Sequence, residues 1–346
     1  MMSDDTHDLP DDPDRDDDDI DLEADDLDPD DLDHDGIEDA PADLTPLPER
    51  PRAGFVALVG APNAGKSTLL NALVGAKVSI VSPKVQTTRS RVLGIAMAGD
   101  AQLLFVDLPG IFKPRRRLDR AMVAAAWQGA TDADIVMLLY DASQSRMDED
   151  TAGIVERLKE AGRPAILVLN KIDLIKRDQL LALAASFDAH GIFSRTFMVS
   201  ALTGDGLADL ARHLAETVPE GPWLYPPDQL SDMPQRLLAA EITREKLFLQ
   251  LHQELPYAAT VETETWEEFD DGSVKISQVV YVQRDGQKAI VLGKGGARIK
   301  QISTAARAEI ETLLEQRVHL FLFVKVRENW VDDRERYEPW GLDYNA

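Results

Sequence analysis

The chain has 346 residues, with 37 Lys plus Arg, 62 Asp plus Glu and no cysteine, so its formal net charge is −25 at pH 7. The lack of cysteine excludes disulfides, thiolate metal sites and cysteine nucleophiles, and suits a reducing cytoplasm. No apolar stretch approaches the roughly 18 residues of a membrane span, and the N-terminus lacks the basic start and apolar core of a signal peptide, so we expect a soluble cytoplasmic protein.

Residues 1–50 form an acidic leader. They hold 23 Asp plus Glu against only Arg15 and Arg50, a net charge of −21, which leaves −4 for the rest of the chain. Because the leader is rich in Asp and Pro and has few large apolar residues, it cannot bury enough surface to fold, and we expect disorder. Its simplest role is a solubility tail; the alternative is an autoinhibitory arm that competes for basic residues further along the chain.

A phosphate-loop pattern follows the leader. The apolar run 55–59 predicts a strand, and the pattern over 69–73 predicts a helix. Between them, in the required order of strand, loop and helix, stand the residues of the pattern G-x-x-x-x-G-K-[ST], namely Gly60, Ala61, Pro62, Asn63, Ala64, Gly65, Lys66 and Ser67. Its glycines let backbone N–H groups face phosphates, and the helix N-terminus adds its positive end. We expect Lys66 to reach the β- and γ-phosphates, Ser67 to ligate Mg²⁺ and Thr68 to belong to the same site, the alternative being an ordinary Gly-rich turn.

The polar segment that follows predicts a switch loop. It reads Val85-Gln86-Thr87-Thr88-Arg89 and is flanked by Ser82-Pro83-Lys84. A Thr hydroxyl here would close on Mg²⁺ when a γ-phosphate is present and leave after hydrolysis. Thr88 is the first candidate and Thr87 the second, and a Thr-rich edge strand is the alternative interpretation.

A second phosphate-side fragment is Asp107-Leu108-Pro109-Gly110, which follows the apolar run 103–106. The carboxylate therefore emerges at the C-terminal edge of a strand, where α/β sheets bind ligands. We expect Asp107 to hold Mg²⁺ through water and Gly110 to approach the γ-phosphate, so that Lys66, Thr88 and Gly110 form the catalytic set. Alone, this tetrapeptide is usually just a turn.

The next residue, Ile111, stands where many P-loop hydrolases carry the Gln that orients the attacking water. An isoleucine cannot do this, so we expect slow intrinsic hydrolysis that waits for a partner or a monovalent cation. Asn63 would supply an oxygen ligand to such a cation, and hydrolysis would then run faster in K⁺ than in Na⁺.

Two further fragments favour guanine as the base. Asn170-Lys171-Ile172-Asp173 follows the apolar run 165–169, and Ser200-Ala201 follows the run 196–199. The Asp173 carboxylate can accept from N1–H and N2–H of guanine, whereas adenine would leave it unpaired at a cost of about 1–3 kcal/mol. Lys171 is expected to lay its stem on the base, and a backbone N–H at Ser200 or Ala201 to bind O6. Together the fragments predict a GTP-hydrolysing α/β domain over residues 51–220, with a six-stranded, mostly parallel, doubly wound sheet and helices on both faces.

Beyond a Pro-rich linker at 221–232, residues 233–346 predict a smaller α+β domain. A helix is expected from Gln235 to about Leu251, and alternating patterns predict strands over 259–265 and 274–282. The apolar run Ala289–Leu292, interpreted as a strand, leads through Gly293-Lys294-Gly295-Gly296 into an amphipathic helix that reaches about Leu314, and a last strand covers 318–324.

These motifs together resemble the Era family of bacterial GTPases. The resemblance lies in Pro62-Asn63, in Gln86-Thr87-Thr88-Arg89, in the apolar Ile111 and in the C-terminal Gly-Lys-Gly-Gly, and it spans about residues 53 to 340. Leu108 and Ala64 depart from the usual Thr and Val, but neither carries chemistry. The second domain accordingly looks like a type II KH domain, in which a GxxG loop clamps about four unpaired nucleotides.

The resemblance implies an RNA site around the GxxG loop. Its expected residues are Ile290, Leu292, Gly293, Lys294, Gly295, Gly296, Arg298, Ile299 and Lys300. From residue 229 to the end the net charge is −5, but Arg284, Lys288, Lys294, Arg298 and Lys300 against Asp285 give a local charge of +4. Lys294 and Arg298 are the residues for which the acidic leader would compete. The bland alternative is that the loop merely turns a strand into a helix.

As an Era-like protein, the chain would bind the 3′ end of 16S ribosomal RNA and act in 30S subunit assembly, as a monomer with GTP or GDP, Mg²⁺ and K⁺ as ligands and without DNA. A weak peripheral association with the inner membrane is also implied, although the sequence offers no amphipathic basic helix for it. Two alternatives stay open, namely an RNA chaperone with GTP as a structural ligand and a signalling GTPase that docks a protein.

Overall fold

The computed structural model describes residues 48–84, 87–144, 146–251 and 255–346. The acidic leader up to residue 47, with its predicted disorder, and Val85 and Gln86 of the predicted switch lie outside the described residues. Within the described part, none of the helices has the length and apolar character needed to cross a membrane.

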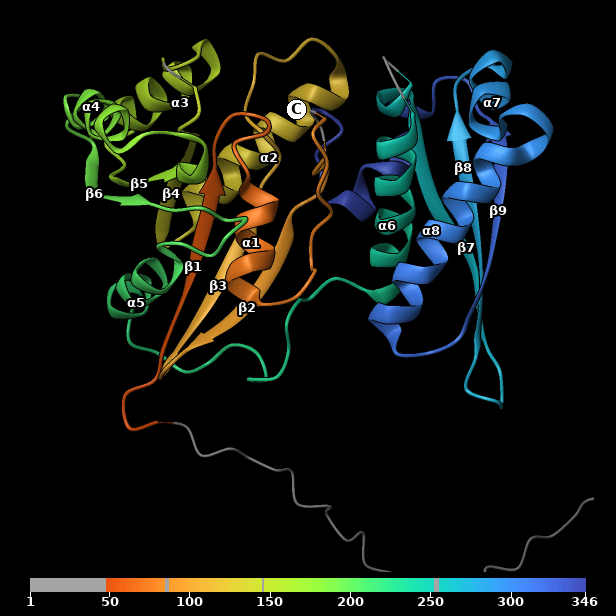
Figure 1. Ribbon diagram of the computed structural model, residues 1–346, viewed down its shortest axis with the longest axis horizontal. Helices are drawn as coiled ribbons and strands as arrows, with labels where there is room; N and C mark the ends of the chain where they lie inside the picture. Colours follow the sequence, from red (N-terminus) through yellow and green to blue (C-terminus); the bar gives the residue numbers. More distant parts are fainter. Residues whose placement is uncertain (1–47, 85–86, 145, 252–254) are drawn as a thin grey trace, which may run out of the picture. The chain divides into compact units, whose positions relative to one another are not determined.

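The first domain is built on one six-stranded sheet (Figure 1). Its strands are β1 (Arg52–Val59), β2 (Val92–Ala98), β3 (Ala101–Asp107), β4 (Ile135–Asp141), β5 (Ala165–Asn170) and β6 (Phe193–Met198). They lie in the order β2-β3-β1-β4-β5-β6, and only β2 runs antiparallel to its neighbour. The predicted mostly parallel six-stranded sheet is confirmed. Because β1, β3 and β5 are parallel, the predicted ligand-binding fragments that follow them emerge at one edge of the sheet.

Helices cover both faces of this sheet, as predicted. They are α1 (Lys66–Val74), α2 (Arg117–Asp132), α3 (Glu149–Glu160), α4 (Arg177–Asp188) and α5 (Leu207–Thr217). One core cluster joins the sheet to α2, α3 and α4 through residues such as Ala126, Ile154 and Phe187. A second cluster joins the opposite face to α1 and α5, through Leu70 and Leu210. The sheet is therefore buried on both sides, which explains why its central strands read as continuous apolar runs.

The second domain packs helices against one face of a three-stranded sheet of order β7-β8-β9. Its elements are α6 (Gln235–Gln250), β7 (Ala259–Glu268), β8 (Val274–Val282), α7 (Asp285–Leu292), α8 (Ala297–Leu314) and β9 (Val318–Val326). The predicted strands and the two long helices are confirmed. The prediction of a strand over Ala289–Leu292 is wrong, because this run belongs to α7. Val291 is buried and Leu292 packs against the core, whereas Ala289 and Ile290 are exposed, and four apolar residues are too few to distinguish this helix from a strand.

The predicted linker 221–232 runs along the first sheet. The Ile95 N–H donates to Leu230 O at 2.9 Å, and the Gln102 side chain binds the backbone of Leu224 and Tyr225. After β9 the chain forms short 3₁₀ turns, and Tyr337 and Leu342 pack against Leu118 and Met122 of α2 in a small core of their own. Connections at both ends of the second domain are thus fixed to the first.

Candidate functional site

The phosphate loop joins β1 to α1 and needs glycine at two positions. Gly60 and Gly65 have φ values of 156° and 96°, and a Cβ added there would lie 2.5 Å from Leu139 O and 2.3 Å from Asn170 Nδ2. Side chains do not fit at such distances, so glycine is required by contact as well as by conformation. The loop closes around a cavity of about 300 Å³ whose lining includes Pro62, Asn63, Gly65, Lys66, Ser67, Thr68, Thr87, Thr88, Gly110 and Lys171. The structure thereby brings these predicted residues together.

Lys66 is buried at the floor of this cavity. Its ammonium donates to Gly60 O at 3.1 Å and Ala61 O at 3.2 Å. Burial lowers the pKa of Lys66 to about 8, and the charge of Asp107 opposes this shift. Phosphate oxygens next to the ammonium would stabilise its charged form far better than two neutral carbonyls do.

Three hydroxyl groups converge on the Asp107 carboxylate. Its Oδ2 accepts from Ser67 at 2.6 Å, from Ser79 at 3.0 Å and from Thr88 at 3.1 Å, and the Ser67 and Thr88 oxygens are 3.0 Å apart. Within the described residues, Asp107 Oδ1 is buried and has no hydrogen-bond partner. Burial raises the pKa of Asp107, while Lys66 and the three hydroxyls lower it.

This oxygen cluster fits Mg²⁺, a hard cation that prefers carboxylate, hydroxyl and water oxygens. The unpartnered Oδ1 is the observation that supports the fit, since a buried carboxylate oxygen normally finds a partner. The predicted metal set Ser67, Thr88 and Asp107 is therefore assembled. Of the two predicted candidates, Thr88 contacts Asp107, whereas the Thr87 hydroxyl donates to Lys84 O at 2.6 Å.

The residues after Asp107 differ in what they present to the cavity. Leu108, Pro109 and Ile111 are buried, and the side chains of Leu108 and Ile111 belong to the core under α2. Ile111 N–H donates to Gly60 O at 3.2 Å, so this residue supports the phosphate loop from below. Of these four residues, Gly110 is the one that lines the cavity, and a Cβ added to it would lie 3.1 Å from Pro62. Among Leu108, Pro109, Gly110 and Ile111, direct access to a nucleotide therefore falls to Gly110.

The predicted guanine loops are linked to the phosphate loop by Asn170. Its Nδ2 donates to Ala64 O at 2.9 Å, and its Oδ1 accepts from Ala201 N at 3.0 Å. Asn170, at the end of β5, thus connects its own loop to the phosphate loop and to the loop that contains Ala201. The Ala201 N–H expected to bind guanine O6 is engaged with Asn170, and the Ser200 N–H with Asp205 O, so an O6 contact requires Ala201 to share its donor.

Lys171 and Asp173 follow β5, and each is bonded to a neighbouring loop. Lys171 has a left-handed φ of 64°, and its ammonium binds Asn63 O at 2.9 Å and Asp141 Oδ2 at 2.6 Å. Its side chain is thereby held beside the cavity. Asp173 is exposed, and its Oδ1 accepts from Ser200 Oγ at 2.6 Å, which orients the carboxylate and leaves the other oxygen for a base.

The residues on both sides of Thr88 are bound by residues of the second domain. Arg244 of α6 donates to Thr87 O. On the other side, the buried Arg89 donates to Ala259 O at 3.0 Å, and its guanidinium lies 5.7 Å from the Phe248 ring centroid and 5.6 Å from that of Trp330. Both neighbours of Thr88 in sequence are therefore held by residues of the second domain.

The Gly-Lys-Gly-Gly loop connects α7 to α8, so it turns a helix, and not the predicted strand, into the following helix. Gly293, Gly295 and Gly296 have φ values of 71°, 60° and 79°, which only glycine adopts readily. Lys294 and Lys300 are exposed, Ile290 is 50% exposed, and Leu292 and Ile299 are half-buried against the core. Arg298 donates to Ile290 O at 2.6 Å, which ties α8 to α7 beside the loop. An open apolar strip thus lies next to a loop whose backbone can approach a phosphate closely.

Two family models match separate parts of the chain. A family model described as "50S ribosome-binding GTPase" matches residues 55–171, and one described as "KH domain" matches residues 254–331. GTPase Era of Rhizobium meliloti is 66% identical over 293 residues, which cover 85% of this chain and 93% of that protein. GTPase Era of Agrobacterium fabrum is 63% identical, with 85% and 92% covered. The chain belongs to the Era family of GTPases.

Solved Era structures agree with this assignment. A structure of Era in complex with MgGDPNP and nucleotides 1506–1542 of 16S ribosomal RNA is 37% identical, with a TM-score of 0.79 over 84% of this chain and 99% of that one. A variant of Aquifex aeolicus Era bound to GDP and AlF₄⁻ is 38% identical, also with a TM-score of 0.79 and the same coverage. The family, the fold and the GTPase activity inferred from the motifs are confirmed, and Mg²⁺ with a guanine nucleotide is the ligand of this Era-family site.

Sequence reasoning missed three polar residues of the site. Ser79 binds Asp107, Asn71 holds the backbone N–H of Val78 and Ser79, and Asp141 anchors Lys171. Asp141 ends β4 as Asp107 ends β3, so its position after an apolar run was a usable signal. Ser79 and Asn71 carry no such signal, because a serine between apolar residues and an asparagine inside a helix match no phosphate-binding pattern.

Proposed function

We propose that this GTPase binds the single-stranded 3′ end of 16S ribosomal RNA through its GxxG loop during 30S subunit assembly, and that the bound nucleotide controls this binding. The RNA part is supported by the Era structure that contains MgGDPNP together with nucleotides 1506–1542 of 16S RNA. It is also supported by the three positive-φ glycines, which let an RNA backbone approach the loop beside the exposed Lys294.

The observation that carries nucleotide control is the position of Thr88. Its hydroxyl binds Asp107 Oδ2 at 3.1 Å, at the site that Mg²⁺ and a γ-phosphate would complete. Its neighbours Thr87 and Arg89 are bound by Arg244 and Ala259 of the RNA-binding domain. Movement of Thr88 after loss of the γ-phosphate must therefore break or drag contacts with that domain, which couples the two sites energetically.

Hydrolysis in this account depends on positioning by residues other than Ile111. Lys66 and the helix N-terminus would supply positive charge at the β- and γ-phosphates. Ser67, Thr88 and Asp107 would hold Mg²⁺, and the metal ion would supply further positive charge against the charge that develops there. We further propose that Asn63, which is exposed at the mouth of the cavity with a φ of 64°, offers an oxygen to K⁺. Equal turnover in K⁺ and Na⁺ would remove Asn63 from that role.

A pair of glycine variants tests the RNA part. Gly296→Asp places a carboxylate in the GxxG loop, at a φ of 79° with open space around the added Cβ. Gly272→Asp makes the same change in the β7–β8 turn, at a φ of 76° and also in open space. The strain is matched, so we expect only Gly296→Asp to abolish binding of a 16S RNA 3′ fragment. Equal affinities of the two variants for that fragment would refute RNA binding at the loop.

A further inference from the structure

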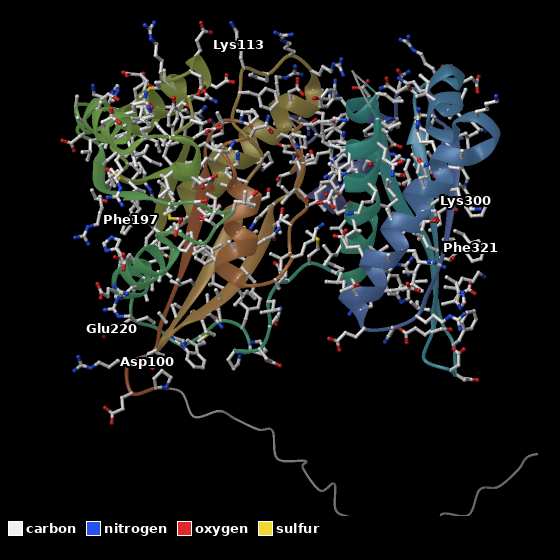
Figure 2. The ribbon with its side chains drawn as sticks, viewed as in Figure 1. Asp100, Lys113, Phe197, Glu220, Lys300 and Phe321 are labelled. Carbon is white, nitrogen blue, oxygen red and sulfur yellow. The ribbon has the colours of Figure 1, made fainter. Side chains whose placement is uncertain are left out.

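The segment that leads into α2 is the most basic part of the first domain. Residues 113–120 read Lys-Pro-Arg-Arg-Arg-Leu-Asp-Arg, which gives five positive charges and one negative charge in a chain whose net charge is −25. Lys113, Arg115, Arg116 and Arg120 are exposed, and we call these four residues the α2 basic segment. Figure 2 shows Lys113 on the loop before α2, at the outer edge of the first domain.

The cations of this segment lack carboxylate partners within ion-pair distance in the described part of the chain. Among the described residues, no ion pair involves Lys113, Arg115, Arg116 or Arg120. Asp119 is buried, and its carboxylate accepts the backbone N–H groups of Arg115 and Arg116 at 3.0 and 2.9 Å. Asp119 therefore caps the N-terminus of α2.

Two neighbours limit the extent of the basic surface. Arg117 turns toward the C-terminal segment, where its guanidinium lies 4.4 Å from the Tyr344 ring centroid and 3.9 Å from Asp332. Asp150 of α3 accepts the Lys113 N–H at 3.3 Å, so acidic side chains lie beside Lys113. Arg115, Arg116 and Arg120 are thus the centre of the segment.

This arrangement costs stability in the isolated protein. Cations near a helix N-terminus are unfavourably placed in the field of the helix dipole, and the closely spaced guanidinium groups also repel one another. Phosphate groups would relieve both effects, since they pair with guanidinium groups and favour the positive helix end. Several exposed cations on an open surface suit the repeated charges of a phosphodiester chain.

We propose that the α2 basic segment binds the phosphodiester backbone of the RNA, in addition to the nucleotides clamped by the GxxG loop. The inference rests on the proposed function. A KH loop clamps only about four nucleotides, whereas the RNA in the related Era complex spans nucleotides 1506–1542. An RNA of that length carries many phosphates beyond those of four nucleotides, and the exposed cations of the α2 basic segment have the charge to bind some of them.

The segment also links RNA to hydrolysis. Gly110 lines the nucleotide cavity, and Arg115 follows it after only four residues. RNA held by Arg115 and Arg116 would restrict the chain segment between Gly110 and α2. This segment begins at the nucleotide cavity, where the γ-phosphate would lie. RNA would then stimulate hydrolysis although Ile111 cannot orient water.

A charge-matched pair of variants tests this inference. The first combines Arg115→Gln, Arg116→Gln and Arg120→Gln. The control combines Lys159→Gln, Lys176→Gln and Arg177→Gln, which removes three exposed positive charges from α3 and the start of α4. The probe is the 16S RNA fragment of nucleotides 1506–1542, with affinity measured from low to high salt and hydrolysis measured with and without RNA.

We expect the first variant to lower the slope of log affinity against log salt by about 0.7 for each lost phosphate contact, which is about fivefold in affinity per contact at 0.1 M salt. RNA stimulation of hydrolysis should fall in parallel, while hydrolysis without RNA stays unchanged. The control should keep both the slope and the stimulation. A first variant that matches the control in slope and stimulation overturns the inference, and failure of the unmodified protein to bind the fragment overturns the proposed function instead.

Discussion

Replacing Gly65 by alanine should disconnect the phosphate loop from the guanine loops. Gly65 has a φ of 96°, and its added Cβ would lie 2.3 Å from Asn170 Nδ2. Asn170 would have to move, and its bonds to Ala64 O and Ala201 N, of 2.9 and 3.0 Å, would be lost. Gly75→Ala is the matched control, because Gly75 caps the other end of α1 with a φ of 78° and open space around its added Cβ.

Both variants carry a conformational strain of about 1–3 kcal/mol. Gly65→Ala also loses the two Asn170 hydrogen bonds, worth about 2 kcal/mol, so its free energy of unfolding should fall further than that of Gly75→Ala. Because the same bonds hold the nucleotide loops in place, restoring this arrangement on binding would weaken the affinity for GDP and GTP by up to roughly 30-fold. Titration with a fluorescent guanine nucleotide measures the affinity, and urea denaturation measures the free energy of unfolding. If Gly65→Ala binds nucleotide as tightly as Gly75→Ala, the bracing role of Asn170 is wrong.

Three further variants test other parts of the site. Asp173→Asn should shift the preference from guanine to xanthine nucleotides, because the amide can donate to the extra oxygen of xanthine; competition binding with XTP and GTP measures this, and an unchanged ratio would contradict base recognition by Asp173. Ser79→Ala removes one of the three hydroxyl groups that donate to Asp107 Oδ2. The Mg²⁺ concentration that slows GDP release half-maximally should then rise about fivefold, equivalent to about 1 kcal/mol. If the dependence of GDP release on Mg²⁺ is unchanged, Ser79 does not position Asp107 for the metal. Arg89→Ala removes the hydrogen bond to Ala259 O and two cation–π contacts, and RNA affinity should then depend less on the bound nucleotide; an unchanged dependence would show that coupling takes another route.

Patterns of short range made the nucleotide site predictable. The phosphate loop, Asp107 and Asn170 each follow an apolar strand, and parallel strands bring their C-terminal ends to one sheet edge. Sequence spacing alone was therefore enough to place these residues at one edge of the sheet. Thr88, the first candidate for the switch threonine, bonds to Asp107 in the structure, whereas the Thr87 hydroxyl bonds to Lys84 O.

Contacts between distant segments were not predictable. Arg244 and Thr87 are separated by 157 residues, and Arg89 and Ala259 by 170. No local sequence pattern marks such pairs, so the contacts of the second domain with Thr87 and Arg89 became visible only in the structure. The α7 helix was missed for a different reason, since four apolar residues fit a strand and a buried helix equally well.

The central claim is that GTP controls RNA binding through Thr88 and its neighbours Thr87 and Arg89, which contact the second domain. Its most direct test is the affinity of the full-length protein for a 16S RNA 3′ fragment, measured by fluorescence anisotropy with saturating Mg²⁺ and either GDPNP or GDP. The account predicts tighter binding with GDPNP, because the analogue keeps Thr88 and the contacts on both sides of it in place. Equal affinities in the two nucleotide states would contradict it.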